Sequence, residues 1–185
     1  MDLVARFASA LLGLAALGLT LPTPAAAAAG TAAAPDLAEL PQRWRDDDGR
    51  ELALARLAGR RVVLTMAYAS CHRFCPLTIK SLEAMQRRLD DRGEQAHIVV
   101  VGYDPANDDP AAWHQYRRNH HLDRANWHFL TGSRENTERL ARALGFDFWK
   151  YDEHVMHGSR ALVFDAGGKA QAAIGPETPD WASVL

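Results

Sequence analysis

Hydrophobic positions in this chain follow two different periods after residue 60. Short runs rich in β-branched residues, in which nearly every position is apolar, indicate strands buried on both faces. Elsewhere apolar residues recur every three or four positions, as Leu82, Met85 and Leu89 do, and this spacing indicates helices that pack on one side. The pattern predicts strands at 61–67, 97–103, 127–130, 160–164 and 170–174, and helices at 76–92, 110–122 and 134–144.

Capping and turn residues support these boundaries. Pro76 suits the first turn of a helix, Asp109 and Ser133 are N-cap residues, and Gly145 ends the third helix. The sequence Asp-Ala-Gly-Gly at 165–168 separates the last two strands and predicts a hairpin. Strands and helices therefore alternate until a final hairpin, and this order predicts an α/β domain with a mixed sheet.

The N-terminal region has a different composition. An apolar run at 7–21 is shorter than the ~20 residues that cross a bilayer, and the alanines after it are typical of a peptidase site. Residues 1–29 are therefore expected to be a signal peptide, with an uncleaved anchor as the alternative. We expect residues 30–45 to be a flexible tether and 46–185 to form the domain. The expected location is the periplasm, or the periplasmic face of the inner membrane if the leader is retained.

Composition narrows the classes of partner. The chain has 185 residues, with 21 basic and 23 acidic side chains and a formal net charge of −2. Because the two signs are interspersed, no basic stripe is available for nucleic acid, and we expect no nucleic-acid partner.

The only two cysteines, Cys71 and Cys75, carry the clearest chemical signal. They follow the first buried strand and precede Pro76, which places them at a crevice where α/β sheets bind ligands. A helix N-terminus there stabilises thiolates, which bind metals and attack disulfides. A C-x-x-x-C pair alone does not decide between a metal site, a redox pair and a structural disulfide. A structural disulfide is disfavoured because so short a loop adds little closure entropy.

Four segments resemble the Sco/SenC family of thioredoxin-fold copper proteins. The first combines residues 48–50 with 57–63 and resembles the opening turn and hairpin that lead into the core strand. The others are the Tyr-Ala-Ser-Cys to Cys-Pro-Leu-Thr segment at 68–78, the Asp-Pro-x-x-Asp segment at 102–108, and His157 with Asp165 eight residues later. The joint match is far more specific than any one motif. It implies a thioredoxin-like three-layer α/β sandwich, with a mixed central sheet and flanking helices.

The resemblance also implies one copper ion, Cu(I) or Cu(II), held by Cys71, Cys75 and His157. Thiolates suit Cu(I) and an imidazole allows Cu(II), although Zn(II) or Ni(II) can occupy such a set in vitro. His154 and His72 lie near these ligands in sequence and are further candidates.

As a family expectation, the chain is a metallochaperone that delivers copper to the copper centre of a respiratory cytochrome c oxidase, or keeps the cysteines of that centre reduced. Its expected partners are the copper-receiving subunit of the oxidase, close to the membrane, and a thiol reductant protein. We expect a carrier rather than an enzyme.

A periplasmic thiol-disulfide oxidoreductase of thioredoxin-like type is the alternative, with Cys71 and Cys75 as its redox-active pair. A peroxidase is a third reading, made less attractive by the close pairing of the cysteines. His157 favours copper, because a dithiol oxidoreductase needs no imidazole so distant in sequence. The two main roles can coexist.

Two further groups of side chains allow more than one interpretation. Asp104 and Asp108 either cap a turn after a strand or contact a partner. His114, His120 and His121 fit a solvated helix face better than a second metal site.

Overall fold

The computed structural model describes residues 35–69, 75–146, 148–151, 154–175, 178 and 180–185. For residues 75–76, 148–151 and 154–157 it describes the backbone alone.

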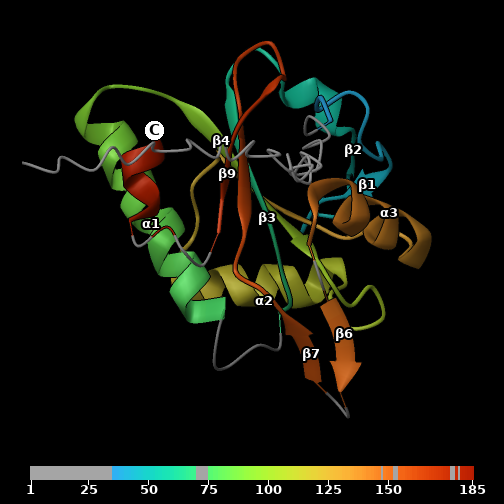
Figure 1. Ribbon diagram of the computed structural model, residues 1–185. Helices are drawn as coiled ribbons and strands as arrows, with labels where there is room; N and C mark the ends of the chain where they lie inside the picture. Colours follow the sequence, from blue (N-terminus) through green and yellow to red (C-terminus); the bar gives the residue numbers. More distant parts are fainter. Residues whose placement is uncertain (1–34, 70–74, 147, 152–153, 176–177, 179) are drawn as a thin grey trace, which may run out of the picture. The chain divides into compact units, whose positions relative to one another are not determined.

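A five-stranded mixed sheet forms the centre of the domain, in the order β5-β4-β3-β8-β9 (Figure 1). Strands β3 (Arg61–Ala67), β4 (Ala96–Gly102) and β5 (Trp127–Leu130) are parallel. Strands β8 (Ala161–Phe164) and β9 (Ala170–Ile174) form an antiparallel hairpin on the other side of β3. The continuous apolar runs are thus explained, because β3 and β4 have helices or chain segments on both faces.

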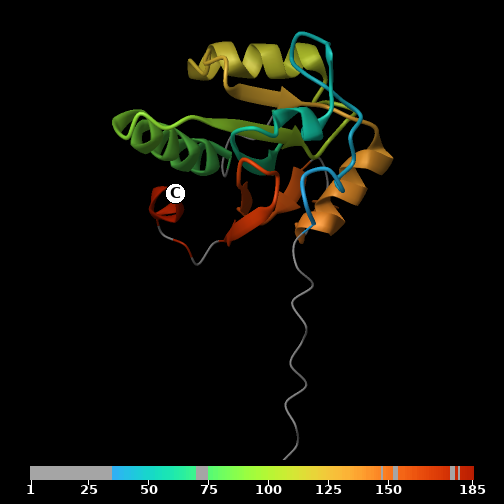
Figure 2. The same cartoon turned by 90° about the horizontal axis from the view of Figure 1, so that it is seen from above.

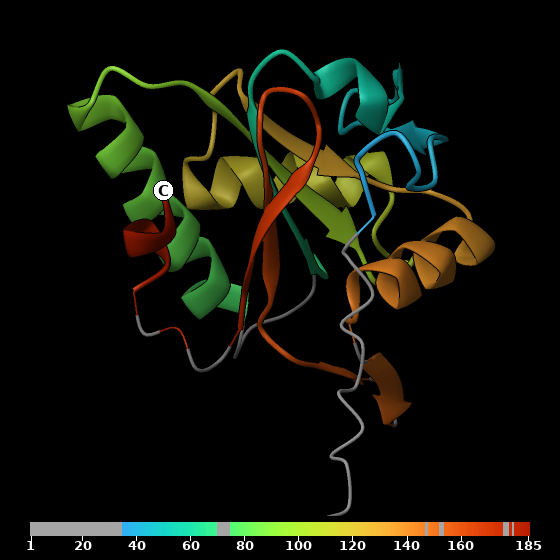
Figure 3. The same ribbon diagram turned by 45° about the horizontal axis from the view of Figure 1, so that its top comes forward.

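One face of the sheet is covered by α1 (Cys75–Asp91), α2 (Pro110–His120) and the short 3-10 helix η2 (Trp181–Val184). η2 lies against α1 (Figure 3). The helix side chains buried on this face come from the periodic positions of the sequence. They are Ile79, Leu82, Met85, Trp113, Tyr116 and Trp181.

The opposite face is covered by α3 (Arg134–Leu144), the 3-10 helix η1 (Leu54–Leu57) and the segment that precedes η1. Figure 2 shows α3 and this segment, coloured blue to cyan, close together. The sheet therefore lies between two covering layers, as a three-layer α/β sandwich requires.

The segment before η1 corrects the expected tether boundary. Residues 36–45 were expected to be flexible, but Leu37, Leu40 and Trp44 are each 1–2% exposed and belong to the core. The Trp44 indole N–H donates to the carbonyl of Pro41 at 2.6 Å. Apolar spacing at every third or fourth residue here was hidden by the Ala- and Pro-rich composition before it. The part of the expected leader and tether before residue 35 lies outside the described residues.

Two short hairpins lie outside the central sheet, and the first encloses the turn at 48–50 that the resemblance implies. β1 (Trp44–Arg45) pairs with β2 (Glu51–Leu52), and β6 (Phe148–Tyr151) pairs with β7 (His154–His157). The β6–β7 segment, where no strand was predicted, forms a two-stranded sheet apart from the central one (Figure 1). Its runs of four residues are too short to show a strand period in the sequence.

Helix boundaries follow the predicted caps. The Asp109 carboxylate accepts the amide of Ala112 at 2.8 Å, and the Ser133 hydroxyl accepts the amide of Asn136 at 3.2 Å. Gly145 ends α3 with φ 65°, a conformation that glycine adopts readily. Among the described residues, no helix has the length and apolar character to cross a membrane.

Candidate metal centre

The predicted copper ligands fall at the edges of the described structure. Cys75 is the first residue of α1 and His157 is the last residue of β7. Cys71 and His72 lie outside the described residues. His154 begins β7, at the other end of the strand from His157. The ligand set therefore remains a prediction, and the described residues around it show how its segments are placed.

A side-chain contact joins the segment after His157 to the helix that begins at Cys75. The hydroxyls of Thr78 and Ser159 lie 3.3 Å apart, and Thr78 is 3% exposed. Thr78 is three residues after Cys75, and Ser159 is two residues after His157. Thr78 and Ser159 are 81 positions apart in the sequence. Their contact therefore brings together two segments that carry predicted ligands.

The same segment is tied to the sheet next to the contact. The Thr65 hydroxyl on β3 donates to the carbonyl of Arg160 at 2.5 Å, and Thr65 pairs with Ala161 at the start of β8. Because β8 runs antiparallel to β3, its start lies near the end of β3 that leads to Cys71. The predicted cysteine and histidine segments therefore share one end of the sheet.

Asp108 ties the end of β3 to the connection between β4 and α2. Its Oδ1 accepts the amide of Ala69 at 2.7 Å and its Oδ2 accepts the amide of Asp104 at 2.8 Å. Asp108 is completely buried, so the turn interpretation holds for it and contact with a partner does not. The Asp104 carboxylate accepts the side-chain amide of Asn107 at 2.8 Å and also serves the turn.

Burial has a clear electrostatic effect on Asp108. Loss of hydration raises the pKa of this carboxyl to about 7. The amides of Ala69 and Asp104 lower the pKa, and the charges of Asp104 and Asp109 raise it further by smaller amounts. So strong a pKa shift is unusual for a carboxyl in a turn. Strongly shifted pKa values cluster at functional sites, so this end of the sheet is a candidate for one.

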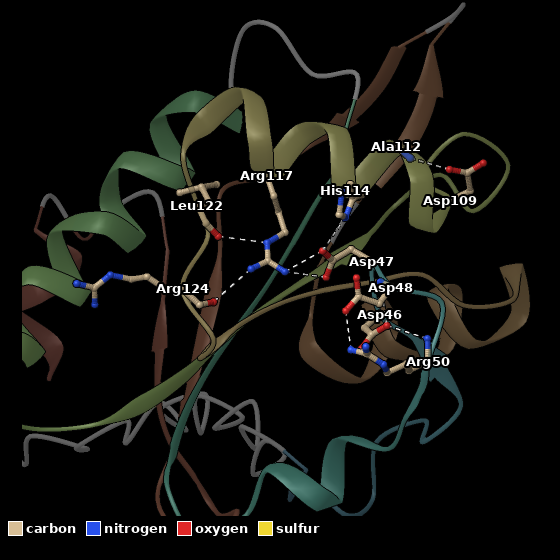
Figure 4. Close-up of polar contacts among 10 residues, drawn as sticks. All are labelled: Asp46, Asp47, Asp48, Arg50, Asp109, Ala112, His114, Arg117, Leu122 and Arg124. Carbon is tan, nitrogen blue, oxygen red and sulfur yellow. Dashed lines mark hydrogen bonds and ion pairs between the residues drawn. The ribbon is translucent and has the colours of Figure 1, made fainter.

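Three metal-ligating side chains gather elsewhere, near α2. Asp47, Asp48 and His114 have ligand atoms within 4.8 Å of one another (Figure 4). Both oxygens of Asp47, however, accept from Nη1 of Arg117 at 2.9 and 2.8 Å. Arg117 also donates to two main-chain carbonyls that follow α2. A guanidinium cation therefore already neutralises the carboxylate that a metal would need.

The three histidines on α2 and at its C-cap lie on the solvent side, as expected. His114, His120 and His121 are all exposed, in agreement with a solvated face. His120 lies over the ring of Tyr116 with 4.3 Å between ring centroids.

Sequence reasoning missed a pair of histidines inside the sheet. His97 Nδ1 and His128 Nε2 lie 2.9 Å apart, on β4 and β5. Burial, followed by the charges of His97 and Arg117, lowers the pKa of His128 to about 4. Burial and the charge of Arg60 lower the pKa of His97. Both imidazoles are therefore neutral at neutral pH and share a hydrogen bond. Only the register of β4 with β5 brings them together.

The chain is similar to known proteins over most of its length. The SCO1/SenC family model matches residues 34–184. The chain belongs to the SCO1/SenC family. It is 28% identical over 102 residues to the SCO1 protein homolog of Bacillus subtilis, and 30% identical over 125 residues to a protein of Stutzerimonas stutzeri named "Putative copper-binding protein". These matches cover 55% and 64% of this chain, and 53% and 60% of the two relatives.

Solved structures confirm the thioredoxin-like fold expected for a SCO1/SenC protein. Arabidopsis thaliana ScoI with copper bound superposes with a TM-score of 0.69 at 23% identity, over 78% of this chain and 90% of that one. Yeast Sco1 with copper bound superposes with a TM-score of 0.68 at 22% identity, over 81% and 85%. At these identities the likeness establishes the fold.

Proposed function

We propose that this SCO1/SenC protein is a copper-binding metallochaperone. It delivers copper to the copper centre of a respiratory cytochrome c oxidase, or keeps the cysteines of that centre reduced. The contact between Thr78 and Ser159 carries the proposal, because it places the start of the Cys75 helix beside the segment that follows His157. Family membership and the relatives named for copper support the same conclusion.

The proposed site holds one copper ion through Cys71, Cys75 and His157. Two sulfurs and an imidazole form a donor set that accepts Cu(I) and also Cu(II). Its position at the start of α1 favours thiolates, because the helix N-terminus carries partial positive charge. Three protein ligands leave a side of the ion open to an acceptor, so copper can pass to the oxidase subunit by exchange of one ligand at a time.

The proposed compartment is the periplasm, or the periplasmic face of the inner membrane if the leader is retained. There the cysteines must be held reduced, so a thiol reductant protein is the second proposed partner.

A thiol-disulfide oxidoreductase remains the second candidate, because Cys75 begins α1 and a helix N-terminus is a usual position for a reactive cysteine. In that function one cysteine attacks a partner disulfide and the other resolves the mixed disulfide. No imidazole is needed, so His157 separates the two candidates.

The deciding experiment is Cu(I) titration of the reduced full chain under argon against a chromophoric chelator. We expect one tightly held copper, lost in Cys71→Ser and Cys75→Ser and weakened about 10–100-fold in His157→Ala. His154→Ala is the matched control at the other end of β7 and should bind as the wild type does. Failure of the wild type to compete with the chelator would refute the chaperone and leave the oxidoreductase. Equal losses in both histidine variants would refute the choice of His157.

A further inference from the structure

The buried carboxylate of Asp108 makes two kinds of bond. Its bond to the amide of Asp104, four residues earlier, belongs to the turn after β4. Its bond to the amide of Ala69 crosses to a different segment, 39 residues away. Ala69 follows β3 and is two residues before Cys71. The turn explains the first bond but not the second.

The end of β4 is shaped to admit this carboxylate. A Cβ added at Gly102 would lie 2.6 Å from the Cβ and 2.8 Å from Oδ2 of Asp108, closer than real side chains approach. Beside it, the amide of Tyr103 donates to the carbonyl of Ala67 at 2.9 Å. Backbone and side-chain bonds therefore fasten the end of β3 to the start of the β4–α2 connection.

A simple helix cap does not need a buried acid. Asp109, the next residue, caps α2 while exposed to solvent. Burial of a carboxyl is unfavourable, and it raises the pKa of Asp108 to about 7. From its fully buried position, Asp108 accepts the amide of the half-buried Ala69, a bond that an exposed cap such as Asp109 does not make.

We propose that Asp108 is a positioning residue for the copper site: by holding the amide of Ala69, it fixes the point at which the Cys71–Cys75 segment leaves β3. Asp108 contacts no proposed ligand and acts through the backbone. The effect on copper affinity rests on the proposed function. The effect on the thiol–disulfide equilibrium of Cys71 and Cys75 does not.

The test compares Asp108→Asn with Asp165→Asn in the reduced full chain. Asp165 also accepts two hydrogen bonds, from the amide of Lys169 at 2.9 Å and from the side chain of Gln171 at 3.0 Å. It lies in the β8–β9 turn, at the opposite end of the sheet from Ala69, because β8 ends beside the start of β3. It therefore controls for the general cost of losing a turn carboxylate.

We expect Asp108→Asn to weaken Cu(I) affinity about 10–100-fold, as loss of a residue that orients metal ligands does, and Asp165→Asn to change it less than about twofold. Amide exchange at Ala69 should accelerate in Asp108→Asn alone. Wild-type affinity in Asp108→Asn, or an equal loss in Asp165→Asn, would overturn the assignment.

A second readout needs no copper. The thiol–disulfide equilibrium of Cys71 and Cys75 against glutathione depends on how the two sulfurs are presented. Asp108→Asn should shift it, while Asp165→Asn should not. If the wild type binds no copper, the proposed function fails, but this shift would still support positioning and its absence would overturn it. If Asp108→Asn does not fold, Asp108→Ser replaces it. Failure of both to fold would also overturn the proposal, since Asp108 would then serve the whole fold.

Discussion

Acidification should weaken the fold through the histidine pair in the sheet. His97 and His128 share a hydrogen bond between ring nitrogens at 2.9 Å, and the pKa of His128 is lowered from 6.5 to about 4. In the unfolded chain the ring takes up a proton near pH 6.5, whereas in the folded protein it does so only near pH 4. The unfolded state therefore binds more protons within this window. Stability from His128 is complete above pH 6.5 and is lost as the pH falls toward 4.

The size of the effect follows from the shift. Each pKa unit corresponds to about 1.4 kcal/mol, so the shift of His128 sets an upper bound of about 3 kcal/mol. His128 is only partly buried, and solvent reduces the effect to about 2 kcal/mol between pH 7 and pH 4. Asp108 works in the opposite direction, because its raised pKa makes the folded state lose stability as the pH rises from about 4 to 7. The wild-type profile alone therefore contains both contributions.

The contributions of His128 and Asp108 are separated by urea unfolding of the wild type and of His128→Gln. Both proteins are measured at pH 7, 6, 5 and 4.5 with chelator present. Glutamine can hydrogen-bond to His97 but does not titrate. We expect the stability difference between wild type and variant to shrink by about 2 kcal/mol on acidification. His120→Gln, an exposed control, should follow the wild-type curve. A difference that stays constant from pH 7 to 4.5 would refute the reasoning.

Two packing predictions concern the other face of the sheet and the end of α2. A Cβ at Gly132 would lie 2.6 Å from Trp44 Cζ3, so Gly132→Ala should lower the free energy of unfolding by about 1–3 kcal/mol. The control is Gly158→Ala, whose Cβ would meet nothing within 4 Å and which should change the free energy of unfolding by less than about 0.5 kcal/mol. Equal effects of the two variants in thermal unfolding would contradict a steric overlap between residue 132 and Trp44. Arg117→Lys should cost about 1–3 kcal/mol, because lysine cannot hold Asp47 and two main-chain carbonyls together. A loss that disappears in high salt would instead indicate a screened surface pair.

Local periodicity was sufficient to predict the central elements. β3 begins and ends at the expected residues, Arg61 and Ala67, because both faces of a central strand must be apolar. The caps at Asp109 and Ser133 fixed the starts of α2 and α3, since their side-chain oxygens satisfy amides that a helix leaves free.

Elements with a short, hidden or non-local signal were missed. Leu37, Leu40 and Trp44 reach the core from a segment that follows a stretch rich in alanine and proline in the sequence. The pairing of β6 with β7 depends on four-residue strands, too short for alternation to stand out. The contact of His97 with His128 depends on strand register, which two separate runs of sequence do not define.

The same distinction applies to the candidate metal centre. Sulfur and imidazole donors are visible in the sequence because their chemistry is specific to residue type. The contacts that hold the segments carrying the proposed ligands are not visible in the sequence, since those of Asp108 with Ala69 and of Thr78 with Ser159 join residues 39 and 81 positions apart. Neither contact uses a proposed ligand. Substitutions at these positions can therefore change how the ligand segments are held while every donor atom remains, which separates assembly of the site from its chemistry.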